Sequence, residues 1–258
     1  MVEGSHPSFR LSWRPGVMLR ITWVAVSVIL VETLVIGLSA LPGALLLERL
    51  SRVPTTSSTL RAFVVCLGTV PAYAAFAIIL IVLSAFSTWL LGWRTPPDAE
   101  MVVADVGWPL CNWACYGISS HVVRVLVGAM LKATPVWSFY LRINGARLGR
   151  GVYVNSLHVT DHNLLEFGDY VVIGDGAHLS GHTVERDVIK TGRVRLGRGV
   201  MVGLDSIVGI GVEAGPGCQI GALSLVPKYA KLEAGATYVG RPVSRVDLRN
   251  DSGSDRRA

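Results

Sequence analysis

One histidine in the second half of the chain has neighbours suited to acid–base chemistry. His182 follows Gly181 directly, and Glu185 comes three residues later. An imidazole titrates near neutral pH, so it can take a proton from an attacking amine or hydroxyl. Glu185 could orient the ring or attract a cationic acceptor. We predict that His182 is a general base and that Glu185 assists it.

Basic residues gather near the end of the same region. Lys228, Lys231 and Arg241 lie within fourteen residues of one another. Such cations suit the pyrophosphate and 3′-phosphate of a pantetheine donor, although a solvated basic rim would look the same in sequence. Neither a cysteine nor a serine stands beside a plausible base, so direct attack in a ternary complex is favoured over an acyl-enzyme. Lys228 and Arg241 are the predicted donor-binding residues.

A six-residue repeat supplies the scaffold for these side chains. The residue after each repeated position is glycine in seven of nine cases, although only 28 of 258 residues are glycine. A fixed hexapeptide period is the signature of a parallel β-helix, in which one aliphatic per hexapeptide points inward. The small residue beside it would fit a corner that often needs a positive φ. The repeated positions are Phe167, Ile173, Leu179, Leu196, Val202, Val208, Ala214, Ile220 and Val226.

The repeat breaks once, between Leu179 and Leu196. These positions are 17 residues apart where 18 would keep the period, so we expect a loop to leave the coil around 185–193. Loops that leave a regular scaffold often carry function, and His182 and Glu185 lie at this break. We predict a single-stranded left-handed parallel β-helix over 141–242, followed by a disordered tail at 243–258.

The spacing of four histidines leaves a metal site as an alternative. His158 and His178 are twenty residues apart, and so are His162 and His182. One coil is three hexapeptides, about eighteen residues, so each pair could lie on successive coils. Three converging imidazoles could bind zinc, as in β-helical carbonic anhydrases. The preferred prediction is that no metal is required.

The first part of the chain is apolar enough for a membrane. Hydrophobic residues make up 51% of the sequence, only Glu32 is charged between residues 21 and 47, and 62–91 carries no charge. About twenty apolar residues span a bilayer as a helix. We therefore expect an arm and two transmembrane helices over 1–97. Residues 98–140 would hold a linker and either an interfacial helix that docks the β-helix or a third membrane segment at 108–130.

The net charge of +6 comes from scattered basic residues rather than from a stripe. This pattern predicts membrane lipid rather than nucleic acid as a partner. Soluble proteins with this scaffold are commonly trimers, which favours a homo-oligomer. The open ends of a short stack need covering, and a preceding interfacial segment that covers one end would allow a monomer or dimer. We expect a multi-pass protein of the cell membrane with the β-helix in the cytoplasm, because thioester donors occur there.

Several motifs resemble known acyltransferases. YVGRP at 238–242 resembles the G-x-P ending of hexapeptide-repeat acyltransferases. Three further segments resemble the membrane-linked C-terminal domains of ε-poly-lysine synthetase-type non-ribosomal peptide synthetases. They are TPVWSFYLRINGARLG at 134–149, GHTVERDVIKTGRVRLG at 181–197 and ALSLVPK at 222–228. The resemblance covers roughly residues 100–242.

This resemblance implies amide formation between a carrier-bound aminoacyl thioester and a free amine. The implied roles fall on His182 and, more weakly, on Glu185 and Lys228. No adenylation or carrier domain is evident, so the donor is expected to be coenzyme A or the phosphopantetheine of a separate carrier protein or synthetase. The expected enzyme is a membrane-bound acyltransferase acting on an amine or hydroxyl. The alternatives are a non-catalytic scaffold or accessory subunit of a synthetase and the zinc enzyme above.

Overall fold

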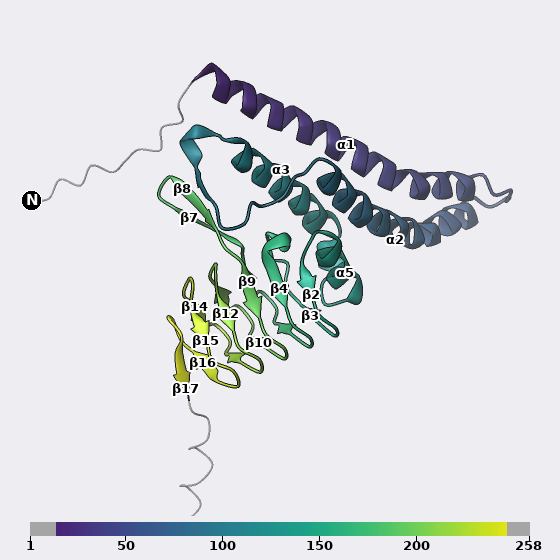
Figure 1. Cartoon of the computed structure of the whole chain (residues 1–258). Helices are drawn as coiled ribbons and strands as arrows, with labels where there is room; N and C mark the ends of the chain where they lie inside the picture. The colour runs from purple at the N-terminus through teal and green to yellow at the C-terminus, as the bar shows by residue number, and fades with distance from the viewer. Residues whose placement is uncertain (1–13, 247–258) are drawn as a thin grey trace, which may run out of the picture.

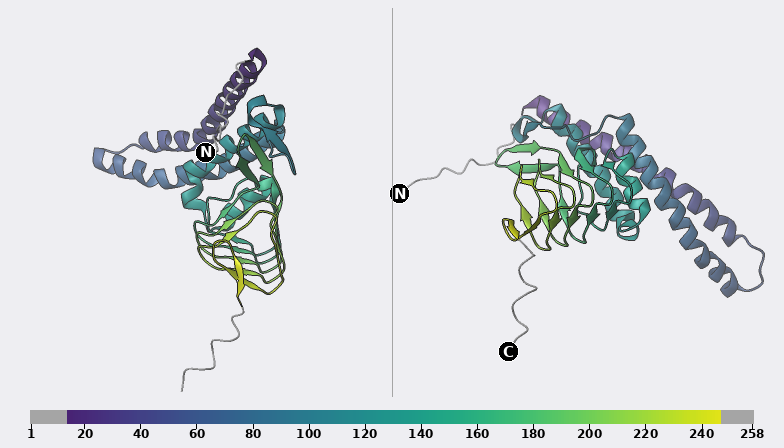
Figure 2. Two further views of the ribbon diagram at one scale, coloured as in Figure 1. Left: turned by 90° about the vertical axis from the view of Figure 1, so that its left-hand side faces the viewer. Right: turned by 60° about the horizontal axis from the view of Figure 1, so that its bottom comes forward.

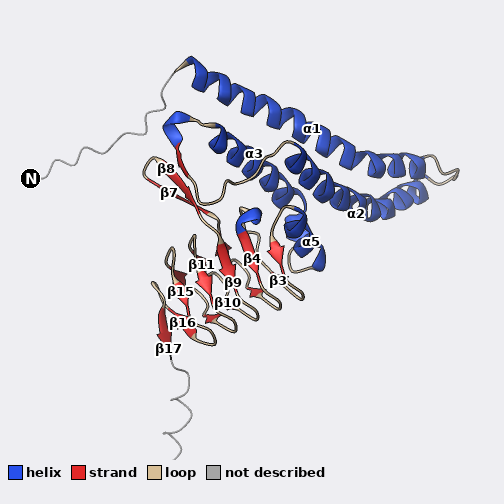
Figure 3. Ribbon diagram, in the orientation of Figure 1, coloured by secondary structure: helices blue, strands red, loops and turns tan. Residues whose placement is uncertain are grey.

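The computed structural model describes residues 14–246 and has two joined parts (Figure 1). Helices from the first half of the chain lie against one end of a stack of short strands from the second half (Figure 3). The predicted arm and most of the predicted tail lie outside the described residues.

The two longest helices form an antiparallel hairpin. Helix α1 spans Pro15–Ser51 and α2 spans Ser58–Leu90. The α2 N-terminus is capped by Ser57, whose hydroxyl accepts the backbone N–H of Leu60 at 3.3 Å, which satisfies one otherwise unpaired donor. Gly43 lets the two helices approach, because a Cβ there would lie 3.1 Å from the carbonyl oxygen of Ala72.

A third helical run lies between this hairpin and the strands. It comprises α3 (Trp108–Val123), a π-helical turn η2 (Arg124–Gly128) and α4 (Ala129–Leu131). Arg124 donates to the carbonyl oxygen of Leu157 at 3.3 Å, so this run contacts the strand domain. Within the described chain, α1, α2 and Trp108–Leu131 are each long and apolar enough to cross a membrane.

Most of the strands belong to three faces, and the strands within each face run parallel to one another. Successive coils stack below the helices (Figure 2). The first face consists of β2 (Arg147–Leu148), β4 (Leu165–Phe167), β9 (Val194–Leu196), β12 (Glu213–Ala214) and β15 (Lys231–Leu232). The second consists of β3 (Tyr153–Val154), β5 (Val172–Ile173), β10 (Met201–Val202), β13 (Gln219–Ile220) and β16 (Thr237–Val239). The third consists of β6 (His178–Leu179), β11 (Ile207–Val208) and β14 (Leu225–Val226).

The pairing register gives the period of the coil. Met201 pairs with Gln219 and Ile207 pairs with Leu225, so one coil takes eighteen residues. The repeated aliphatic side chains are buried and stack in the core, as predicted. The fold is therefore a parallel β-helix, and its left-handed turn remains a prediction.

The repeat glycines are required by close packing rather than by a positive φ. A Cβ on Gly174 would lie 2.7 Å from the backbone nitrogen of Leu204 on the next coil. The positive φ values fall two residues later, for example at Gly176 and Gly199. The expectation that the repeat glycine itself takes a left-handed conformation is therefore wrong.

The first face presents a ladder of alternating charge to solvent. Its outward side chains are Arg147, Glu166, Arg195, Glu213 and Lys231, one from each strand in order along the face. Neighbouring members are joined by ion pairs of 2.7 to 3.9 Å between nitrogen and oxygen. Opposite charges on adjacent strands favour the native register. Because these side chains are charged and point outward, this face is a solvated side of the domain.

Both ends of the stack are covered by other elements. Helix α5 (Pro135–Ile143) buries Trp137, Tyr140 and Leu141 completely in the core at the first coil. At the last coil, β17 (Ser244–Val246) turns back and pairs antiparallel with β16. The predicted disorder of the tail is therefore wrong for Ser244–Val246, because backbone pairing orders these residues.

The break in the repeat is an antiparallel hairpin. Strands β7 (His182–Glu185) and β8 (Val188–Thr191) leave the stack, and β1 (Glu100–Val102) pairs with the far side of β8. Two short 3-10 turns, η1 (Val103–Asp105) and η3 (His162–Leu164), accompany them. The hairpin thereby joins the β-helix to the segment that connects α2 with α3.

Candidate active site

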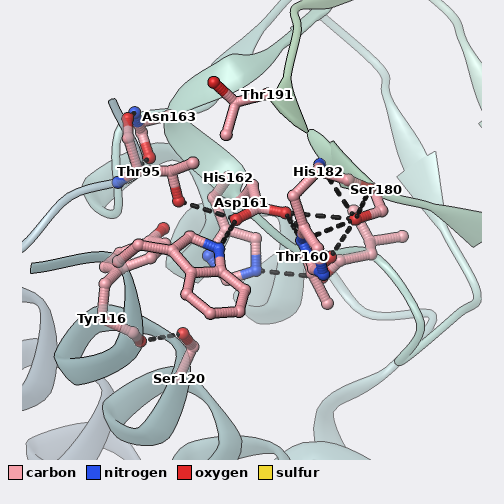
Figure 4. Close-up of polar contacts among 12 residues, drawn as sticks. Thr95, Tyr116, Ser120, Thr160, Asp161, His162, Asn163, Ser180, His182 and Thr191 are labelled. Carbon is pink, nitrogen blue, oxygen red and sulfur yellow. Dashed lines mark hydrogen bonds and ion pairs between the residues drawn. The ribbon is translucent and has the colours of Figure 1, made fainter. Parts of the chain in front are cut away.

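His182 stands where the chain leaves the stack, and it is paired with a buried carboxylate (Figure 4). Its Nδ1 lies 2.5 Å from Oδ2 of Asp161. An ionised carboxylate only accepts hydrogen bonds, so Nδ1 carries the proton of this contact. In the neutral ring Nε2 is then unprotonated and free to accept a proton from a substrate.

Asp161 is held by a shell of donors. Its Oδ1 accepts the hydroxyl of Thr95 at 2.7 Å and the indole N–H of Trp113 at 3.2 Å. Its Oδ2 accepts the hydroxyl of Ser180 at 3.2 Å in addition to the His182 contact. Burial by itself raises the pKa of Asp161, but the hydrogen bonds from His182 and the hydroxyls outweigh it, so the pKa lies below its usual value. The carboxylate is therefore charged at neutral pH.

A cavity of about 540 Å³ opens beside His182 over the third face of the β-helix. Its apolar wall includes Ile207 and Leu225, which are the outward residues of β11 and β14. His178 and Lys228 line the same cavity. The cavity thus combines an imidazole, an apolar surface and a cation.

Glu185 does not contact His182. It lies at the other end of β7, where it forms ion pairs with two lysines. Its carboxylate pairs with Lys228 and, at 3.2 Å, with Lys190. The hydrogen bonds from these two lysines lower the pKa of Glu185. The structure therefore gives the orienting contact to Asp161, and the prediction that Glu185 orients His182 is wrong in this respect.

The two predicted donor-binding cations occupy different positions. Lys228 lines the cavity that holds His182. Arg241 lies on the last coil, outside the residues that line the cavity, and its Nε donates to the carbonyl oxygen of Leu223. The structure brings Lys228, but not Arg241, together with the predicted base.

The four histidines do not assemble as a metal site. His162 is fully buried between Tyr116 and Tyr140, with ring centroids 6.0 and 5.6 Å away, and burial lowers its pKa to about 4. His158 and His178 stack at 6.2 Å on the outside. Among residues 14–246 no three His, Cys, Asp or Glu side chains come together as a metal-binding group.

Three members of the site, Asp161, Thr95 and Trp113, are not predicted from the sequence. Asp161 lies 21 residues before His182, close to the one-coil spacing that brought the histidine pairs to attention, so the same criterion would have found it. Thr95 and Trp113 reach the site from the helical part of the chain. No local pattern marks them, because their contacts depend on how the two parts pack.

These elements define a class of protein, a hexapeptide-repeat β-helix that carries a carboxylate–histidine pair beside a cavity on one face. No family model matches the chain. In sequence the chain is similar to the δ-poly-L-ornithine synthetase of Acinetobacter baumannii, with 27% identity over 161 residues. The match covers 61% of this chain but only 12% of that synthetase.

Solved structures with partial similarity are hexapeptide-repeat or related acyltransferases. An acetyltransferase of this type from Vibrio cholerae matches with a TM-score of 0.37 and 18% identity, over 40% of this chain and 62% of its own. The acetyltransferase domain of PglB from Neisseria gonorrhoeae matches with 0.33 and 25%, over 40% and 43%. A galactoside acetyltransferase in complex with coenzyme A matches with 0.34 and 22%, over 40% and 55%.

Proposed function

We propose that this chain is a membrane-bound acyltransferase that moves an acyl or aminoacyl group from a pantetheine thioester to an amine or hydroxyl. The observation that carries the proposal is the Asp161–His182 pair beside a cavity on a hexapeptide-repeat scaffold. A buried carboxylate bonded to Nδ1 fixes the tautomer that leaves Nε2 as the base.

The reaction follows from this geometry. Nε2 of His182 takes the proton of the attacking amine or hydroxyl while the nucleophile forms a bond to the thioester carbonyl carbon. Asp161 stabilises the imidazolium that results. When the tetrahedral intermediate collapses, the carbon–sulfur bond breaks and the imidazolium returns its proton to the leaving thiolate. Acceptor and donor are thereby converted to amide or ester and free thiol, and the enzyme is restored.

The donor is proposed to be coenzyme A or a carrier-bound phosphopantetheine. The apolar wall of the cavity suits the pantetheine arm, and Lys228 supplies a cation for phosphate. Arg241 would contribute only to the part of the donor that extends beyond the cavity along the last coils. Similarity to a poly-ornithine synthetase favours an amine acceptor and an aminoacyl group.

The proposal includes the location of the protein in the cell. The three apolar helices would anchor the chain as a multi-pass protein in the cell membrane. The β-helix would face the cytoplasm, where thioester donors occur. A homo-oligomer or a complex with a carrier protein or synthetase would supply further walls for the open cavity.

Transfer from a panel of thioesters tests the function. Full-length protein in detergent is incubated with acyl- and aminoacyl-coenzyme A or with a loaded carrier, and amine or sugar acceptors are screened by mass spectrometry. His182→Ala should lower turnover by about 10²–10⁴. Equal transfer by the variant would remove His182 from the mechanism. No transfer by wild-type protein from any donor would contradict the proposal and favour an accessory subunit.

A further inference from the structure

We propose that the helical part of the chain supplies two positioning residues, Trp113 and Thr95, which set the orientation of Asp161 and through it of His182. This inference rests on the proposed role of His182 as a base. Trp113 belongs to α3, and Thr95 belongs to the segment between α2 and β1. The catalytic pair itself belongs to the β-helix, so the site would be built jointly by both parts.

The two carboxylate oxygens of Asp161 have different hydrogen-bond partners, which supports this role. Trp113 and Thr95 both donate to Oδ1, at 3.2 and 2.7 Å, whereas His182 uses Oδ2 at 2.5 Å. Rotation of a carboxylate about its terminal bond is nearly free. Two donors from separate elements on Oδ1, together with the hydroxyls of Ser180 and Thr160 on Oδ2, therefore restrain the plane of the group and keep Oδ2 at Nδ1.

Trp113 also contacts the base directly. Its ring lies edge-on to the imidazole of His182, with centroids 5.0 Å apart and an interplanar angle of 71°. Such an edge-to-face contact is a favourable aromatic geometry. One side chain of α3 thus restrains both members of the pair.

Thr95 is fastened to the turn that carries Asp161. The side chain of Asn163 accepts the backbone N–H of Thr95 at 3.3 Å and donates to its carbonyl oxygen at 2.8 Å. Asn163 follows Asp161 by two residues, so the donor and the carboxylate belong to one hydrogen-bonded unit. Asp161 has a φ of 53°, an uncommon conformation that these contacts help to hold.

Trp113 is anchored from the other side. It packs against a small buried cluster formed by Met101 of β1, Leu110 of α3 and Ile189 of β8. This cluster joins the helices to the hairpin whose first residue is His182. Any movement of α3 relative to the hairpin would therefore change the carboxylate–histidine geometry.

Substitutions that remove only the donated hydrogen bonds test the inference. In full-length protein, Trp113→Phe keeps an aromatic ring and Thr95→Val keeps the shape, but each removes one donor to Oδ1. We expect each to lower kcat about tenfold, typical for loss of a hydrogen bond to a charged group, with KM for the donor unchanged. Thr95→Ser, which retains the hydroxyl, should restore most of the turnover.

A double-mutant cycle separates positioning from packing. In an Asp161→Asn background, Trp113→Phe should have no further effect on kcat, because the residue would act through the carboxylate. A loss of similar size in both backgrounds would overturn the inference. Trp108→Phe is the matched control, since Trp108 is on the same helix, is half exposed, and meets Trp23 edge-to-face, with ring centroids 5.2 Å apart, instead of contacting the site.

A measurement without substrate keeps the inference distinct from the proposed reaction. Diethyl pyrocarbonate modifies unprotonated imidazole nitrogen, and mass spectrometry gives the rate at His182. We expect the rate to change in the same direction in Trp113→Phe and in Asp161→Asn, with no additional change in the double variant, and to be unchanged in Trp108→Phe. An unchanged rate in Trp113→Phe would contradict positioning even if the chain proved to transfer no acyl group.

Discussion

At the scale of single residues, the geometry of a strand decides which carboxylate serves His182. Glu185 is three residues away in β7, and residues an odd number apart on a strand point to opposite faces. It therefore reaches Lys228 and Lys190 instead. Asp161 lies on the previous coil and meets the ring across the stack. Proximity in sequence was misleading here, whereas the coil period carried the correct information.

The buried ring of His162 predicts a sensitivity to acid. Its pKa of about 4 in the folded protein lies below the ordinary value of 6.5, since burial disfavours the charged form. The unfolded chain then binds more protons between these values, so stability falls as pH drops from about 6.5 to 4, by up to about 3 kcal/mol. Thermal unfolding of the full chain in detergent measures this loss.

The matched variant for that measurement is His162→Asn. It should be less stable than wild type at pH 7 because the packing against Tyr116 and Tyr140 is lost. Its unfolding temperature should depend less on pH between 6.5 and 4. An equally steep dependence in the variant would assign the acid sensitivity to another group.

At the scale of elements, the hexapeptide repeat predicted the coils well because one buried apolar residue in every six is a local requirement. The hairpin at the break was expected as a loop, but its pairing with β1 was not predictable, since β1 comes from the segment before α3. The six-residue period likewise did not predict that α5 covers the core, because the buried residues of a helix follow a different spacing.

Packing between coils predicts which glycines tolerate a side chain. Gly174→Ala places a Cβ 2.7 Å from the backbone of Leu204, so the coil must shift, at a cost of about 1–3 kcal/mol. Gly199→Asn is the control, because that position is open and Asn accepts its φ of 69°. Thermal unfolding should show a lower midpoint for the first variant and little change for the second. Equal losses would contradict the packing explanation.

The ion pair between β7 and the last coils predicts a split in donor kinetics. Lys228→Ala should raise KM for a coenzyme A thioester about five- to tenfold with little change in kcat, because it removes a cation from the cavity wall. Glu185→Gln frees the same lysine from its partner and should leave KM unchanged or lower. Steady-state kinetics at fixed salt distinguish these outcomes, and a large fall in kcat for Lys228→Ala would place the lysine in chemistry rather than in binding.

At the scale of the whole molecule, the helices and the β-helix share one continuous core. Val35 of α1, Leu80 and Ile81 of α2 and Trp137 of α5 belong to the same buried cluster as the inward residues of the coils. Composition predicted the apolar helices but not this junction, because residues that face lipid and residues that face protein are equally hydrophobic. The two parts are therefore expected to unfold together.

In the proposed membrane setting, the contact between α3 and the Asp161–His182 pair would give the bilayer a mechanical role. A helix whose apolar length exceeds the hydrocarbon thickness tilts to fit, and a tilt of α3 would carry the indole of Trp113 with it. We expect kcat, but not KM, to depend on lipid chain length when the full chain is reconstituted in vesicles. Trp113→Phe should flatten that dependence. The thickness of the bilayer would then change the turnover of the enzyme through one hydrogen bond, which the indole N–H of Trp113 donates.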